Sequence, residues 1–558
     1  MGVTRKTLAA LASGLAVSLV MGAGLTAVAT AQSVKSGGTL YTAMPWGTIP
    51  DNFNPFLPAG SSAGGTLSII YQTLFYDNVV NGQLTPMLGT SYAWSDHNLK
   101  LVITTRSHVR WSDGTPFSAR DVAFTFNYIH RNPALDIYGI WASGLKSVVA
   151  TGPNAVTFTF SKPDTPIFYF ITEQVIVPEH IWATVKDPST FTNTHPVGTG
   201  PFTLTSYSPY EVTYVKNPHY WMTGRPYLHS VVIEAVKSNN TPLLDLIKGT
   251  IGFTYTYIPD IPRTYAARDP AVNKYWWPVT NVNILYMNTQ ESPFTELVFR
   301  RAVARALNTS LIAQRAYYGA IGPANEAAVF PGQVKQWFNP ALKALQWHYN
   351  PAGARKILAQ AGYKWNSSGQ IESPHGNVLP TFRILVGAGW TDFITMAQII
   401  SSELKTLGIS TVIDQEPYST YESSILTGRY DMAISWGAAA GPAPYYLYDQ
   451  GLGSWYSAKR IGQTAVSDWA RFTSPAIDKA LLAYQSTSSP AAQRRAMSTI
   501  ERIVLTQVPF VPLTNRPNFF DYQVRQFTGF PDAANAYNAG DPPDASGADL
   551  MYVNVHLK

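Results

Sequence analysis

The chain has 558 residues, too many for a single compact core, and a prior of about 150 residues per domain indicates roughly three domains. Charged and aromatic residues each make up 13% of the sequence, and the net charge of +6 comes from 40 basic and 34 acidic side chains. Because no run of five or more like charges forms a basic stripe, we expect no nucleic-acid partner.

The N-terminal segment has the pattern of an export signal. Arg5 and Lys6 precede an uncharged stretch over residues 8–29, and residues 29–31 form a small-x-small cleavage site. A transmembrane anchor is the alternative, but the stretch is rich in Ala, Gly and Ser rather than Leu. We therefore predict a signal peptide over residues 1–31 and a mature chain that begins at Gln32.

The sequence contains no cysteine. This absence removes disulfides, thiolate metal sites and the lipid-modified cysteine that tethers many exported proteins. We expect a periplasmic or extracellular monomer without a membrane span once the signal is removed. The low acidic content also suits an acidic external medium, because fewer carboxylates must be protonated there before the fold suffers.

Between residues 37 and 290 the sequence predicts mostly short strands. Residues 98–105 and 155–160 alternate between apolar and polar side chains with period two, which is typical of half-buried antiparallel strands. One short helix is well marked, because Ser118 and Asp121 form a capping-box pattern before an apolar run. We predict that this helix ends near Arg131.

From about residue 295 long helices alternate with single strands, the pattern of α/β units. Helix starts and ends are marked by caps, first-turn prolines and closing glycines. We predict one helix from Pro351 to Gly362 and another from Thr391 or Asp392 to Gly408. A third helix ends at Gly428, and two more begin at Pro475 and Pro490. Predicted strands at 409–414 and 431–436 flank the helix that Gly428 closes, which favours a parallel sheet, and a return strand follows at 509–513.

One catalytic motif occurs. Residues 60–64 match G-x-S-x-G, so a secreted hydrolase with Ser62 as nucleophile is an alternative function. Pro55 and Pro58 precede it, which favours a loop over the strand that this motif requires. The ten histidines are dispersed and no complete glycine-rich fingerprint occurs, so we expect neither a metal site nor a nucleotide or other cofactor.

Aromatic residues next to Gly, Pro and Asn are the remaining signal. In open α/β sheets ligands bind beyond the carboxyl ends of strands, where Trp390 and Trp436 are expected. Each aromatic side chain alone also fits core packing, which claims most Trp and Tyr residues, but as a set on polar loops they favour a stacking surface. The candidate ligand-binding aromatics are Trp46, Trp390, Trp436, Tyr445, Tyr446 and Trp455, and the candidate hydrogen-bond partners are Asn54, Asn288 and Asn515.

An ordered series of segments resembles the bacterial extracellular solute-binding proteins that include the oligopeptide, dipeptide, nickel and cello-oligosaccharide binders of ABC importers. The segment at 111–122 (WSDGTPFSARDV) is the most specific. The others are 37–40 with 54–56, 196–202 with 216–221, 285–288 and 299–308. The resemblance covers nearly the whole mature chain.

The resemblance implies an α/β, two-lobed periplasmic-binding-protein-like fold of type II, with an extra strand-rich subdomain in the first lobe. Lobe I would comprise residues 32–74, 195–285 and 512–558. The subdomain would span 75–194 and lobe II 286–511. It also implies the substrate-binding component of an ABC importer, which is no enzyme and whose partners are a solute and the permease subunits.

The resemblance also bears on the ligand. In oligopeptide binders an aspartate holds the peptide α-amine, and it comes shortly after the Trp of the strand that corresponds to residues 431–436 here. In this chain Trp436 is followed by no carboxylate before Asp449. A buried ammonium without a partner would cost several kcal/mol, so peptide binding is disfavoured but stays open. Residues 435–446, 527–531 and 535–537 resemble the cello-oligosaccharide branch, which we favour. The serine hydrolase and a surface scaffold without a ligand remain alternatives of other classes.

Overall fold

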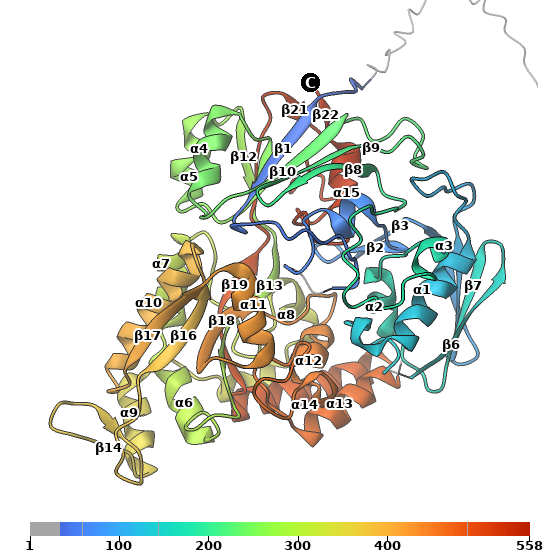
Figure 1. Cartoon of the computed structure of the whole chain (residues 1–558). Coiled ribbons are helices and arrows are strands. Elements are labelled where there is room, and N and C mark those ends of the chain that lie inside the picture. Colours follow the sequence, from blue (N-terminus) through green and yellow to red (C-terminus); the bar gives the residue numbers. More distant parts are fainter. Residues whose placement is uncertain (1–33, 58–59, 143, 488) are drawn as a thin grey trace, which may run out of the picture. The chain divides into compact units, whose positions relative to one another are not determined.

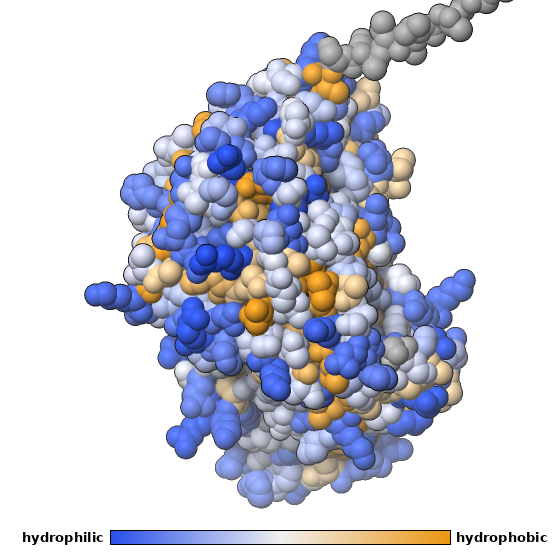
Figure 2. Space-filling model, turned by 90° about the vertical axis from the view of Figure 1, so that its right-hand side faces the viewer, coloured by the Kyte–Doolittle hydropathy of each residue, from blue (hydrophilic) through white to orange (hydrophobic). Residues whose placement is uncertain are grey.

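The computed structural model describes residues 34–57, 60–142, 144–487 and 489–558. The predicted signal peptide lies outside these residues. Within the part of the chain that is described, no helix is long and apolar enough to cross a membrane. On the face shown in Figure 2, hydrophobic residues lie in small groups among hydrophilic ones. Scattered apolar residues of this kind are ordinary for a protein surface.

A seven-stranded mixed sheet organises the first lobe (Figure 1). Its order is β12 (Asn273–Trp276), β20 (Phe520–Gln523), β11 (Phe253–Tyr255), β1 (Thr39–Met44), β10 (Ser230–Ala235), β9 (Glu211–Lys216) and β8 (Phe202–Ser208). β1 runs parallel to both β10 and β11, so the carboxyl ends of these three strands lie at one edge. The short helices of this region are α4 (Thr241–Lys248), α5 (Ile261–Thr264) and α15 (Asp549–Asn554), and the pairs β2 (Phe75–Asn78) with β3 (Gln83–Pro86) and β21 (Phe527–Thr528) with β22 (His556–Leu557) complete it.

The second lobe contains a five-stranded sheet in the order β17 (Thr411–Glu416), β16 (Phe382–Gly387), β18 (Met432–Trp436), β13 (Val279–Met287) and β19 (Phe510–Pro517). The predicted parallel sheet is correct only for β16, β17 and β18. β13 pairs antiparallel with both β18 and β19. The sequence showed two crossover units but could not reveal how strands that enter from the first lobe would pair with them.

The helices of the second lobe follow the predicted caps closely. α9 begins at Pro351 with the Asn350 side chain as its cap, and α11 ends at Gly428 in the left-handed conformation that glycine adopts without strain. α10 begins at Thr391, and α13 and α14 begin at Pro475 and Pro490, as predicted. The helices are α6 (Leu297–Ala306), α7 (Thr309–Tyr317), α8 (Pro331–Trp337), α9 (Pro351–Gln360), α10 (Thr391–Lys405), α11 (Tyr418–Thr427), α12 (Pro444–Leu452), α13 (Pro475–Gln485) and α14 (Pro490–Gln507), and β14 (Lys364–Trp365) pairs with β15 (Ile371–Glu372).

A four-stranded antiparallel sheet forms the strand-rich part of the N-terminal half. Its order is β4 (Gly89–Ser95), β5 (Lys100–Thr105), β7 (Ala155–Phe160) and β6 (Leu145–Gly152), with α1 (Ala119–Arg131), α2 (Ile167–Glu173) and α3 (Glu179–Trp182) beside it. The predicted strand at 155–160 and the predicted helix after Ser118 are confirmed. The predicted lobe limits at 286 and 511 fall inside β13 and β19, and the division into domains stays a prediction.

The capping box of α1 gives a stability prediction. The Ser118 side chain accepts a hydrogen bond from the Arg120 amide, and the Asp121 carboxylate accepts one from the Ser118 amide at 2.8 Å. We expect Ser118→Ala to lower the free energy of unfolding by about 1 kcal/mol, because it leaves helix N–H groups without a partner. Denaturant titration measures this loss. Ser118→Thr, which keeps the hydroxyl, should restore most of it, and equal losses in both variants would contradict the capping role.

Candidate functional site: a pocket between the two sheets

A cavity of about 390 Å³ is lined by residues of both sheets. This volume lies within the range of roughly 300–1,000 Å³ that is typical of small-molecule sites. The chain crosses between the sheets beside this cavity, where the Asn518 amide donates a hydrogen bond to the Pro278 carbonyl. The cavity therefore lies where movement of one lobe against the other would open or close it.

Strand ends supply many of the lining residues. Met44 ends β1, Tyr255 ends β11, and Trp436 ends β18. Trp390 follows β16 and is the N-cap of α10. Because both sheets direct strand ends to the same place, side chains from distant parts of the sequence meet there, which is the arrangement expected of ligand sites in open α/β sheets.

Three half-buried indoles, those of Trp46, Trp390 and Trp436, line the cavity. The rings of Trp390 and Trp436 lie 5.9 Å apart between centroids, and Tyr418 lies 5.6 Å from Trp390. Trp46 comes from the first lobe, and the other two come from the second. Aromatic faces thus meet the cavity from both lobes, as a flat apolar ligand surface requires.

The G-x-S-x-G motif is part of the packing around Trp46. A Cβ atom at Gly64 would lie 2.1 Å from Cη2 of Trp46, so the glycine allows the indole to lie against the backbone. The described residues 45–57 before the motif contain no strand, and the segment after it is η1 (Thr66–Ile70). The strand–turn–helix context of a nucleophile elbow is therefore not found around Ser62.

Five carboxyl groups line the cavity, and they come from separate elements: Asp77, Glu173, Asp392, Asp541 and Asp544. Burial raises the pKa of Asp392 to about 6 and the pKa of Glu173 to about 7. Burial also raises the pKa of Asp77, Asp541 and Asp544 above the usual range. The cavity therefore favours the neutral form of these groups more than water does.

Neutral donors hold these carboxyl groups in place. Asp541 accepts hydrogen bonds from the Tyr76 hydroxyl at 2.7 Å and from the Asn538 amide at 3.0 Å. Glu173 accepts one from the Ser546 hydroxyl at 2.7 Å. Because none of these donors carries a charge, the carboxyl groups keep the capacity to interact with polar or cationic ligand groups.

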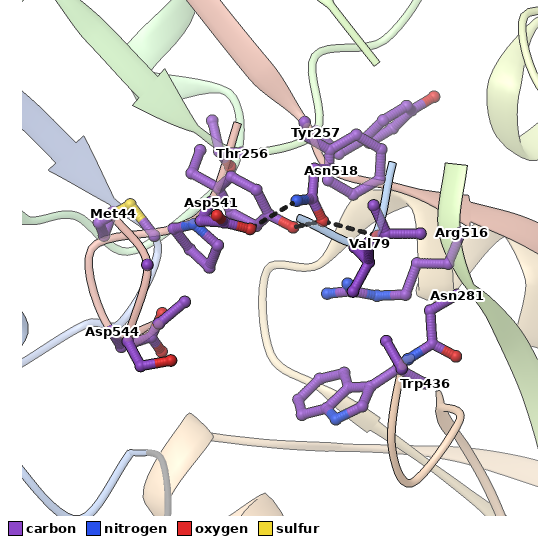
Figure 3. A pocket seen from close by; sticks show the side chains of 18 of the residues that line it. Met44, Val79, Thr256, Tyr257, Asn281, Trp436, Arg516, Asn518, Asp541 and Asp544 are labelled. Atoms are coloured by element: carbon purple, nitrogen blue, oxygen red, sulfur yellow. Dashed lines mark hydrogen bonds between the residues drawn. The ribbon is translucent and has the colours of Figure 1, made fainter. Parts of the chain in front are cut away.

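Arg516 is the only cationic side chain among the described residues that line the cavity. Its guanidinium lies 5.2 Å from the ring centroid of Trp436, and Figure 3 shows it extending over that indole. Asp541 and Asp544 lie on the opposite side of the view in Figure 3. The guanidinium offers several donors in one plane, while the carboxyl and amide oxygens around it offer acceptors.

The asparagines predicted from the sequence do not line this cavity. The Asn54 amide donates to the carbonyls of Pro188 and Phe191, and the Asn288 amide donates to the carbonyls of Gly428 and Tyr430. Both side chains are buried and tie loops to the fold. Asn515 donates to the Pro323 carbonyl.

The remaining predicted aromatics lie elsewhere. Tyr446 is buried and packs behind the lining residue Tyr169, with 4.5 Å between ring centroids. Tyr445 stacks on Tyr484, and with the exposed Trp455 it lines a second, smaller cavity. Of the predicted set, Trp46, Trp390 and Trp436 come together at the main cavity.

Several lining residues were missed by the sequence interpretation. Arg516 is the neighbour of the predicted Asn515, and adjacent side chains on a strand point to opposite faces, so the choice was one position out. Asn281 lies on β13, and the predicted Asn288 directly follows the end of this strand. Asp541 and Asp544 lie in a loop that gives no periodic signal.

The comparisons with known proteins agree with this geometry. The model for "Bacterial extracellular solute-binding proteins, family 5 Middle" matches residues 83–458. The chain belongs to this family. It is a two-lobed solute-binding protein and the substrate-binding component of an ABC importer, so the fold predicted from the sequence is confirmed.

Relatives and solved structures match over most of their length. A glutathione-binding protein of Salmonella typhi is 25% identical over 97% of this chain and 99% of the relative. A putative ABC transporter peptide-binding protein of Brucella ovis is 26% identical over 86% and 87%. The periplasmic oligopeptide-binding protein of Thermotoga maritima, solved with mannohexaose, superposes with a TM-score of 0.87 at 24% identity over 93% and 98%. The oligopeptide-binding protein of Bacillus subtilis, solved with a nonapeptide, superposes with a TM-score of 0.78 at 19% identity over 94% and 100%.

Among the described residues, no group of three or more His, Cys, Asp or Glu side chains is arranged to hold a metal ion. Three carboxyl groups of the main cavity interact, because burial and then the negative charges of Asp541 and Asp77 raise the pKa of Glu173. The site is therefore described by aromatic faces and planar polar groups, which bind organic solutes by stacking and hydrogen bonding.

Proposed function

We propose that the family 5 chain captures an oligosaccharide in the cavity between its lobes and delivers it to the permease of an ABC importer. The observation that carries this proposal is the combination of three indoles from two lobes with planar polar side chains around them. Pyranose rings present apolar C–H faces to aromatic rings, while their hydroxyl groups need both donors and acceptors. Arg516 lines the cavity and supplies donors, and the carboxyl groups that line it supply acceptors.

The electrostatics of the cavity are compatible with a neutral ligand. Burial raises the pKa of Asp392 and Glu173, so these groups are more easily protonated than in water. A protonated carboxyl group both donates and accepts hydrogen bonds, as sugar hydroxyls do. A neutral polyhydroxylated ligand therefore needs no change in the charge of the site.

Capture depends on contacts to both lobes. A ligand that stacks on Trp46 from the first lobe and on Trp436 from the second stabilises the closed arrangement more than the open one. The permease then distinguishes the loaded protein by its closed shape. We further propose that the chain acts outside the cytoplasmic membrane as a monomer, exported by its N-terminal segment, and that it catalyses no reaction.

An oligopeptide or dipeptide is the second candidate. Five carboxyl groups face one guanidinium in the cavity, so an α-amine has partners although no carboxylate follows Trp436 closely in sequence. The expectation that a peptide amine would lack a partner was drawn from one loop. The cavity supplies carboxyl groups from other elements, namely β2, α2, α10 and the loop before α15, so a carboxylate in that loop is not required.

A ligand panel measured at two pH values distinguishes the candidates. We expect cello-, xylo- or malto-oligosaccharides to raise the unfolding temperature, since a ligand at 100 times its Kd adds about 2.7 kcal/mol of stability. Calorimetric titration should give an affinity for the sugar that changes little between about pH 8 and about pH 5, because neither partner needs to be ionised.

A peptide gives a different pattern. Its α-amine needs an ionised carboxylate, and the raised pKa of Asp392 and Glu173 means that these groups become protonated across this interval. Peptide affinity should therefore fall as the pH is lowered. Stabilisation by peptides alone, with this pH dependence, would overturn the oligosaccharide proposal and establish the second candidate. Turnover of an activated ester that Ser62→Ala abolishes would contradict a purely binding role.

A further inference from the structure

A second cavity lies apart from the solute pocket, between α2 with the loops around β7 on one side and α12, α13 and residues 455–456 on the other. Its volume is about 100 Å³, which exceeds the roughly 30 Å³ that one water molecule occupies in the liquid. No residue lines both cavities. The cavity therefore has room for one small molecule.

Two buried carboxyl groups from separate elements line this cavity. Asp164 follows β7, and Asp449 lies on α12, and both are almost fully buried. Burial and then the neighbouring negative charge of Asp164 raise the pKa of Asp449 well above its usual range. A cation between the two groups would relieve the repulsion, because an opposite charge favours the ionised form of each.

A third acceptor is independent of the acid pair. Gln485 is 5% exposed and lines the cavity, and its Oε1 atom has no hydrogen-bond partner among the described residues. The Gln485 amide nitrogen donates to the Tyr445 hydroxyl at 2.7 Å. Tyr445 therefore fixes the orientation of the amide and leaves its oxygen available. A buried carbonyl oxygen without a partner calls for a donor.

The side chains that line this cavity indicate which kind of hydrogen-bond donor it would bind. The rings of Phe170, Tyr445, Trp455 and Tyr456 line the cavity. Aromatic faces attract ammonium groups but supply no ligands to a hydrated divalent metal, which needs about six oxygen ligands. An ammonium group has three or four N–H donors, enough for two carboxylates and one amide oxygen.

We propose that this second cavity binds one small primary ammonium ion and that the ion links the strand-rich subdomain to the second lobe. The ion lies between Asp164 and Asp449 and donates to Oε1 of Gln485. The side chain of Lys162 also lines the cavity but is exposed and forms no ion pair of 4 Å or less with a described carboxylate. The bound group is therefore a separate ammonium ion and not the side chain of Lys162.

The test measures the Tm of the full mature chain, without solute, in different salts at constant ionic strength. We expect ammonium and methylammonium chloride to raise Tm by about 2 °C or more over choline chloride, whose quaternary head donates no N–H bonds. Asp449→Asn and Gln485→Leu should abolish this increment. Trp455→Leu, at a partly exposed position where folding is retained, should reduce it. Glu501→Gln, which removes a buried carboxyl group that lines neither cavity, should keep it.

Three outcomes would overturn the proposal. An equal rise with sodium or potassium chloride would show an alkali-cation site instead. A rise that persists in Asp449→Asn, Gln485→Leu and Trp455→Leu would place the effect elsewhere. A fall in the Tm of Lys162→Gln that methylammonium restores, with no effect of methylammonium on the unaltered chain, would show that Lys162 itself fills the cavity. Solute binding at the main cavity is measured separately, so these results do not depend on the identity of the solute.

Discussion

Replacing Trp436 by Ala is expected to raise the Kd for the solute by about tenfold to hundredfold. Trp436 ends β18, lines the main cavity and lies beneath the guanidinium of Arg516. The substitution removes a stacking face and also leaves Arg516 without the ring that holds it in place. Calorimetric titration with the solute identified by the ligand panel measures the loss.

Two controls separate this effect from general damage. Trp94→Ala removes a half-buried indole that does not line the cavity, and it should leave the Kd unchanged. Trp436→Phe keeps an aromatic face and should recover part of the affinity. A Trp436→Ala variant that binds as tightly as the unaltered protein would remove Trp436 from the site.

The sequence predicted the helices of the second lobe well because their ends carry local chemistry. Asn350 and Gly428 fix α9 and α11 through a side-chain cap and a left-handed backbone, and both signals act within one turn. The pairing of β13 with β18 and β19 was not predicted, because it joins segments more than a hundred residues apart. Long-range register depends on the whole fold rather than on local pattern.

Part of the candidate site was predicted because some of its residues also carry a local signal in the sequence. Trp390 and Trp436 were predicted because one follows a recognisable strand and the other ends one, and both line the main cavity. Asn54 and Asn288 were predicted from their positions in the sequence, but polar side chains next to buried turns often bond to backbone groups, as these two do. Asp541 and Asp544 reach the cavity because the C-terminal segment returns to the first lobe. The resemblance implied that return, but no periodic pattern singles out these two residues.

Stability should be greatest in mildly acidic solution and should fall as the pH rises. Burial raises the pKa of six carboxyl groups far above the values near 4 that they have in an unfolded chain: Asp392 to about 6, Glu173, Asp468, Glu501 and Asp549 to about 7, and Glu422 to about 8. A group of this kind binds its proton more tightly in the folded state, so its contribution is full below the unfolded pKa and is lost as the pH rises through the folded pKa.

The expected loss is large. One pKa unit corresponds to about 1.4 kcal/mol, so a single carboxyl group raised by about three units would contribute a loss of about 4 kcal/mol between about pH 4 and about pH 8. This is a substantial part of an unfolding free energy of about 5–15 kcal/mol. Denaturant titrations across this range should therefore give a maximum at about pH 4 and a decline that is steepest between about pH 4 and about pH 7, which agrees with the acidic external medium suggested by the low acidic content.

Glu422 provides the sharpest test of this dependence. It is 9% exposed, its Oε1 atom has no hydrogen-bond partner among the described residues, and the negative charge of Asp544 raises its pKa beyond the effect of burial. Glu422→Gln has nearly the same shape and cannot ionise, so it should stabilise the protein at about pH 8, flatten the decline and change little at about pH 5. Glu291→Gln, at an exposed position, should leave the curve unchanged. A stability maximum at neutral pH, or a decline that Glu422→Gln does not alter, would show that these carboxyl groups lose their protons without cost to the fold.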